Sequence, residues 1–94
     1  ELLRNRDYCL DAMRRMPRTT LPRPEGAFYL FPSIEGIKDS FEFCRKLLLE
    51  TGVGLAPGVA FGAGGEGSVR ICYAADIGVL EPALERLHRF LERL

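Results

Sequence analysis

The sequence predicts an α+β fold, a small two-layer domain in which helices cover a short, partly antiparallel sheet. Three segments place apolar residues at helical spacing, and short β-branched or aromatic runs lie between them. The chain has 94 residues, which is enough for one hydrophobic core and too few for two. We therefore expect residues 1–94 to form one domain.

The first helix is predicted over residues 2–16. We expect it to end at Pro17, because a proline pushes the preceding residue out of the α region. The apolar residues that recur on one side of this helix are Leu2, Leu3, Cys9, Leu10, Met13 and Met16. Residues 18–24 form an irregular connector, and the aromatic run 27–31 favours a strand that Pro32 closes.

A second helix is predicted to begin at Asp39, because Glu42 follows three residues later in a pattern that resembles a capping box. It should end at Gly52, a residue suited to the left-handed position after a helix. A short strand over residues 53–56 would follow and stop at Pro57. The residues expected to be buried on this helix are Phe41, Cys44, Leu47 and Leu48.

A further strand is predicted over residues 68–74, and a final helix should begin near Gly78. Pro82 would then lie in the first turn, where a proline is tolerated. The apolar stripe of this helix consists of Leu80, Ala83, Leu84, Leu87, Phe90, Leu91 and Leu94.

The composition argues against several classes of function. Lysine and arginine together number 13, as do aspartate and glutamate, whereas proteins that bind nucleic acid or membrane surfaces usually carry a basic excess. The three cysteines form no C-x-x-C pair, and none lies at metal-ligand spacing from His88. We expect reduced thiols, a structural His88, no metal site and a cytoplasmic location. The sequence shows neither a membrane span nor a signal peptide.

Residues 62–67 match the pattern G-x-G-x-x-G of dinucleotide-binding sites letter for letter. That pattern binds a pyrophosphate only where a helix begins at the loop. Here the loop leads into residues 69–73, whose β-branched and aromatic side chains favour a strand. We therefore expect a plain loop with positive-φ glycines.

Arg70 lies in the middle of the last predicted strand. Val69, Ile71 and Tyr73 should point to the core, which leaves Arg70 on the other face between small neighbours. A guanidinium in that position can hold a carboxylate or phosphate through two parallel hydrogen bonds. The side chain could instead extend into solvent or pair with a local acid such as Glu66.

Three motifs together resemble a known family. They are PEGAFYLFP at residues 24–32, GLAPGVAFG at 54–62 and GEGSVRICYA at 65–74. In this order and spacing they resemble the C-terminal small domain of class I/II, fold-type I pyridoxal-phosphate-dependent aminotransferases, the aspartate-aminotransferase-like group. The resemblance extends over essentially the whole chain.

The resemblance implies that Arg70 binds the α-carboxylate of an amino acid or 2-oxo acid substrate. It also implies that the full-length protein is a homodimeric transaminase, and that its pyridoxal phosphate is held by a large domain absent from this chain. Lys38 and Lys46 lack the sequence context of the cofactor lysine, so the chain should contain no catalytic or cofactor-binding residue. Cys72 should be a small packed residue.

The chain begins without methionine and inside a helical pattern, so we expect a fragment of a longer protein that folds but is inactive alone. Two alternatives remain at this point. One is a fragment of a pyridoxal-phosphate lyase with the same fold, and the other is a free-standing module that binds a small carboxylate. The sequence of this domain leaves the specificity for the substrate side chain open as well.

Overall fold

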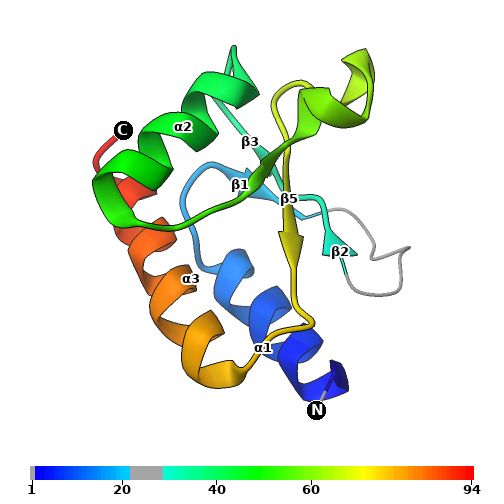
Figure 1. Ribbon diagram of the computed structural model, residues 1–94, viewed down its shortest axis with the longest axis vertical. Coiled ribbons are helices and arrows are strands. Elements are labelled where there is room, and N and C mark those ends of the chain that lie inside the picture. Colours follow the sequence, from blue (N-terminus) through cyan, green and yellow to red (C-terminus); the bar gives the residue numbers. More distant parts are fainter. Residues whose placement is uncertain (1, 22–28) are drawn as a thin grey trace.

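The computed structural model describes residues 2–21 and 29–94. Within these ranges the helices are α1 (Leu2–Arg14), α2 (Ser40–Thr51) and α3 (Ile77–Glu92). The strands are β1 (Thr19–Thr20), β2 (Tyr29–Leu30), β3 (Ser33–Ile34), β4 (Ala56–Pro57) and β5 (Val69–Cys72). β1 pairs with β3, and a second sheet has the order β2-β5-β4; all three pairings are antiparallel. Figure 1 shows the helices gathered on one side of β5, so the predicted α+β fold is confirmed.

The core lies between β5 and the helices. Val69, Ile71 and Tyr73 are at most 4% exposed, as the alternation of the strand predicts. They share one hydrophobic cluster with buried residues of all three helices, among them Met13, Leu47 and Leu87. α3 contacts both α1 and α2, so it joins the three helices into one layer.

α1 ends at Arg14, earlier than the predicted end at residue 16, and Cys9, Met13 and Met16 are buried as expected. Leu3 is 59% exposed, so the prediction that it belongs to the buried side is wrong. Asn5 takes part in the packing instead. It is buried, and its amide Nδ2 donates to the carbonyl oxygens of Tyr73, at 3.1 Å, and Ala75, at 2.6 Å. These two bonds attach α1 to the chain that leaves β5.

The strands are shorter than predicted. The predicted connector contains β1, and β3 was not predicted, because two-residue strands show no periodicity and form only through pairing with each other. In the predicted strand 27–31, residues 27 and 28 lie outside the described residues and β2 covers Tyr29–Leu30. β4 covers Ala56–Pro57 rather than 53–56. Pro57 is tolerated because β4 is an edge strand.

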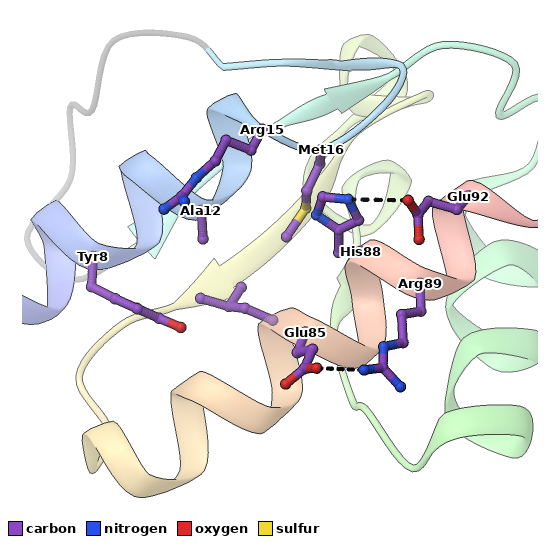
Figure 2. A pocket seen from close by; sticks show the side chains of 9 residues that line it. Tyr8, Ala12, Arg15, Met16, Glu85, His88, Arg89 and Glu92 are labelled. Atoms are coloured by element: carbon purple, nitrogen blue, oxygen red, sulfur yellow. Dashed lines mark hydrogen bonds and ion pairs between the residues drawn. The ribbon is translucent and has the colours of Figure 1, made fainter.

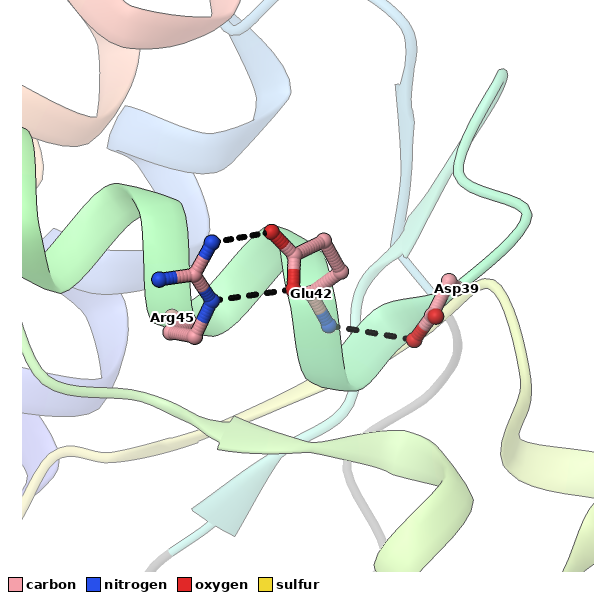
Figure 3. A network of polar contacts seen from close by, with 3 residues as sticks. All are labelled: Asp39, Glu42 and Arg45. Carbon is pink, nitrogen blue, oxygen red and sulfur yellow. Dashed lines mark hydrogen bonds and ion pairs between the residues drawn. The ribbon is translucent and has the colours of Figure 1, made fainter.

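Both predicted ends of α2 are confirmed. The Asp39 carboxylate accepts from the backbone N–H of Glu42 at 3.0 Å, and Gly52 adopts a left-handed φ of 79°. Figure 3 shows this cap together with Arg45, which donates from Nε to the Glu42 carboxylate at 2.9 Å. The hydrogen bond with Arg45 lowers the pKa of Glu42 below its usual value.

The buried side of α2 differs from the prediction. Phe41 is 62% exposed and Leu48 is 51% exposed, whereas Phe43 is buried with its ring edge-to-face on Phe90, at 5.6 Å between centroids. Cys44 and Leu47 are buried as expected. Two apolar stripes share Cys44: one contains Phe41 and Leu48, and the other contains Phe43 and Leu47. Packing against α3 buries the second stripe.

α3 begins at Ile77, one residue before the predicted start. The Asp76 side chain caps it by accepting from the backbone N–H of Gly78 at 2.8 Å. Pro82 is the sixth helical residue, so its predicted place in the first turn is wrong, and the Gly78 carbonyl lacks the usual N–H partner. Leu94 is 47% exposed beyond the end of the helix; the stripe from Leu80 to Leu91 forms the buried side.

Candidate functional site

Arg70 lies in the central strand of the three-stranded sheet. It pairs in register with Ala56 of β4, while its neighbour Cys72 pairs with Tyr29 of β2. Val69 and Ile71 on either side of it point into the core, so the Arg70 side chain extends from the opposite, outer face of the sheet. It is only partly buried there.

Two aromatic rings contact the Arg70 guanidinium. Its Cζ lies 4.3 Å from the ring centroid of Tyr29 and 4.5 Å from that of Phe61. Phe61 ends a 3-10 turn, Gly58–Phe61, that directly follows β4. Phe31 in turn packs against Phe61 edge-to-face, with the ring centroids 5.7 Å apart and the planes at 87°. These neighbours of Arg70 were not predicted from the sequence, where their only signal was the aromatic content of the first two motifs.

Glu66 does not pair with Arg70. Its Oε1 accepts from the backbone N–H of Ser40, at the start of α2, and from that of Gly67 at 3.3 Å. Ser40 is fully buried, and its hydroxyl accepts from the Val59 N–H at 3.2 Å. Glu66 therefore holds the loop against α2. Among the described residues, no carboxylate lies within ion-pair distance of Arg70.

The glycine-rich loop is compact and leads into β5, as predicted, rather than into an α-helix. Two of its glycines, Gly62 and Gly67, have positive φ values of 121° and 91°. Gly58 and Gly65 approach each other through their backbones, and a Cβ on either one would overlap the carbonyl group of the other. The Gly58 N–H donates to the Ser68 carbonyl at 2.8 Å. These contacts fix the turn that carries Phe61.

The three thiols differ in environment. Burial raises the pKa of both the Cys9 and the Cys44 thiol to about 11, which keeps them protonated and unreactive near neutral pH. Cys72 is exposed, so the prediction of a packed residue is wrong. Cys72 lies on the outer face of β5, whereas Val69 and Ile71 point into the core on the inner face.

A groove of about 360 Å³ lies between α1 and α3, lined in part by Tyr8, Arg15 and Met16. Figure 2 shows that its polar side chains on α3 pair along the helix: His88 lies beside Glu92, with 3.6 Å between Nε2 and Oε2, and Arg89 lies 2.7 Å from Glu85. His88 thus lies on the helix surface beside an acid. Within the described ranges, no group of three or more metal-ligating side chains comes together.

The comparisons with known proteins agree with the fold. The sequence model of the family described as aminotransferase class I and II matches residues 1–87. This chain belongs to the class I and II aminotransferase family. Among its relatives, the aspartate aminotransferase of Geobacillus stearothermophilus is 42% identical over an alignment of 88 residues; the alignment covers 87% of this chain and 22% of that protein.

Two further aminotransferases extend the comparison. The valine–pyruvate aminotransferase of Mycobacterium tuberculosis is 42% identical over 89 residues, covering 93% of this chain and 23% of that protein. The solved structure of an alanine aminotransferase from Pyrococcus furiosus superposes with a TM-score of 0.92 at 33% identity. The superposition covers 99% of this chain and 24% of the Pyrococcus furiosus chain. The chain thus spans about a quarter of the length of these aminotransferases.

Within the described part of this chain, no helix is both long and apolar enough to cross a membrane. The lysines, Lys38 and Lys46, are both exposed, the first between β3 and α2 and the second on α2. Within the described ranges, Arg70 combines an outer-face position on the sheet with aromatic contacts on its guanidinium.

Proposed function

We propose that the chain is the C-terminal small domain of a pyridoxal-phosphate-dependent amino acid aminotransferase, and that Arg70 binds the α-carboxylate of the substrate. The observation that carries the proposal is the Arg70 guanidinium, which lies on the outer face of the sheet and has no carboxylate partner among the described residues. The three motifs that resemble the family support the same role.

The chemistry suits an amino acid or 2-oxo acid. A planar guanidinium donates two parallel hydrogen bonds to a carboxylate, and this fixes both the position and the orientation of the substrate. A carboxylate held in this way presents the bonds at Cα in a defined direction, which favours a reaction at that carbon. In this proposal the small domain also closes over the active site when the substrate binds.

We propose that neither Lys38 nor Lys46 is the cofactor lysine, because both are exposed and a cofactor lysine requires a desolvated site. Pyridoxal phosphate supplies the electron sink for transamination. We propose that a large domain outside this chain holds it, and that the 94-residue chain alone is inactive. On the same resemblance, we propose that the complete enzyme is a cytoplasmic homodimer.

The two alternatives receive less support. The relatives reported above are named aminotransferases, which favours transamination over a lyase reaction. Their length, about four times that of this chain, favours one domain of an enzyme over a free-standing binding module. Product analysis of the full-length protein with an amino acid and a 2-oxo acid separates transfer of the amino group from elimination.

The test is steady-state kinetics of the full-length protein with Arg70→Ala and Arg70→Lys on a panel of amino donors. A hydrogen bond to a charged group contributes about 1.5–3 kcal/mol, so loss of a bidentate pair should lower kcat/KM by about a hundred- to ten-thousandfold. The loss should be similar for every donor, because all share the α-carboxylate. Arg70→Lys should recover only part of it.

Arg89→Ala is the matched control, because Arg89 is an exposed arginine on α3 whose guanidinium pairs with Glu85 of the same helix. It should leave both kcat/KM and the bound pyridoxal phosphate unchanged. Near-normal kcat/KM in Arg70→Ala would contradict the proposal. A loss confined to acidic donors would instead place Arg70 in a pocket for the substrate side chain.

A further inference from the structure

The Arg70 guanidinium is contacted by aromatic rings from both sides of its strand. Tyr29 belongs to β2 and Phe61 follows β4, and these two strands flank β5 on opposite edges. The ring centroids lie 4.3 Å and 4.5 Å from Cζ of Arg70, close enough for a cation–π interaction with each ring. The charged group is thus held between elements from two different parts of the chain.

This arrangement restricts how a ligand can approach. Each ring covers part of the guanidinium and excludes water there, which leaves the N–H donors at its edge as the accessible groups. A carboxylate that binds two of these donors lies in the plane of the guanidinium. The rings therefore favour the approach that gives two parallel hydrogen bonds and disfavour contact over the face.

The rings are themselves supported. Phe31 packs edge-to-face on Phe61, and the Gly58–Gly65 backbone contact fixes the turn in which Phe61 lies. Tyr29 is held by the antiparallel pairing of β2 with β5, opposite Cys72. An arginine side chain is otherwise free to rotate about several bonds, and ordering it on binding would cost conformational entropy. Holding it in advance reduces that cost.

We propose that Tyr29 and Phe61 are positioning residues. They preorganise the Arg70 guanidinium, before the substrate binds, for in-plane binding of the substrate carboxylate. This inference rests on the proposed function of Arg70 and adds the residues through which that arginine is oriented. Both rings are partly exposed, Tyr29 at 36% and Phe61 at 49%, so they contribute little to the hydrophobic core. Their contact with Arg70 accounts for aromatic side chains at these surface positions.

The experiment measures the dissociation constant of a simple carboxylic acid without an amino group, such as propanoate, on the full-length enzyme with its cofactor bound. It uses Phe61→Leu and Tyr29→Leu, with kcat and KM determined alongside on several amino donors. Each substitution should weaken carboxylate binding by about three- to thirtyfold, the range expected for losing one cation–π contact. KM should rise for all donors by a similar factor.

Conservative variants and a matched control sharpen the test. Phe61→Tyr and Tyr29→Phe keep a ring and should retain most of the carboxylate affinity. Phe41→Leu removes an exposed ring on α2 that is not one of the two rings over the Arg70 guanidinium, and it should change neither the dissociation constant nor KM. Thermal unfolding and cofactor content identify any variant that is misfolded. Because Tyr29 and Phe61 lie on different elements, one variant still tests the proposal if the other does not fold.

A double-mutant cycle separates this inference from the proposed function. In an Arg70→Lys background, Phe61→Leu should have a much smaller effect, because the planar group that the ring orients is gone. Equal effects in both backgrounds, or normal carboxylate binding in both leucine variants, would overturn the positioning role while Arg70 itself keeps its role. If Arg70→Ala also binds propanoate normally, the proposed function fails as well.

Discussion

The two faces of β5 have opposite properties although their residues alternate along one short strand. Val69 and Ile71 are at most 3% exposed and pack against the helices. Arg70 and Cys72 lie on the other face, the first between two aromatic rings and the second exposed. The inner face stabilises the fold, and the outer face carries the groups with which a ligand can interact. The strand can serve both purposes because side chains alternate with a period of two.

The largest expected effect comes from the inner face. Ile71→Ala removes a buried side chain, and the cavity left behind should reduce the free energy of unfolding of the 94-residue chain by about 2–5 kcal/mol. Cys72→Ala, the next residue on the opposite face, should change it by no more than about 0.5 kcal/mol. Urea unfolding of the two variants checks the contrast, and equal losses would show that the faces do not differ as described.

The stability of the fold should be next most sensitive to substitution in the turn Gly58–Phe61, which carries Phe61 to the outer face of the sheet. Gly58→Ala places a Cβ against the carbonyl oxygens of Gly65 and Ser68, and the overlap should cost about 1–3 kcal/mol. Gly64→Ala is the matched control, since a Cβ there meets no atom within 4 Å. Thermal unfolding of both variants tests this. A Gly58→Ala variant as stable as Gly64→Ala would contradict the close backbone approach.

The buried thiols should make stability depend on pH at the alkaline end. Folding raises the pKa of Cys9 and Cys44 from 9.0 to about 11, so their contribution is complete below pH 9 and is lost as the pH rises to about 11. The free energy of unfolding should therefore fall between pH 9 and 11. In the double variant Cys9→Ala/Cys44→Ala the fall should be shallower. An unchanged pH dependence would mean that these thiols do not contribute.

The smallest expected effect is at the surface of α2. Asp39→Ala removes the side-chain acceptor for the Glu42 N–H and should reduce stability by about 1 kcal/mol. Asp39→Ser keeps an acceptor at the same position and should remain close to the original stability. Circular dichroism during urea unfolding gives both values. A loss as large in Asp39→Ser as in Asp39→Ala would show that the cap is not the cause.

Local signals in the sequence were sufficient for the features that depend on near neighbours. The caps at Asp39 and Gly52 depend on residues within one turn of α2, and both were predicted correctly. The alternation of Val69, Arg70 and Ile71 was also predicted correctly, because it follows from the geometry of a single strand. The position of Arg70 on the outer face could therefore be inferred without the structure.

The environment of Arg70 could not be inferred in this way. Tyr29 is distant from it in sequence and Phe61 precedes it across the glycine-rich loop, and both reach it only because β2 and β4 pair with the two edges of β5. The same holds for Glu66, a possible partner of Arg70 by sequence, which instead accepts hydrogen bonds from Ser40 and Gly67.

The sequence by itself determined the order of the three helices and of β5, the caps of α2 and the face on which Arg70 lies. Only the tertiary structure decided that α2 buries Phe43 rather than Phe41, that Cys72 is exposed, and which rings surround the guanidinium. The physical reason is the range of the interactions. Propensity, capping and periodicity act over a few residues, whereas the choice between two apolar stripes depends on packing between segments far apart in the chain.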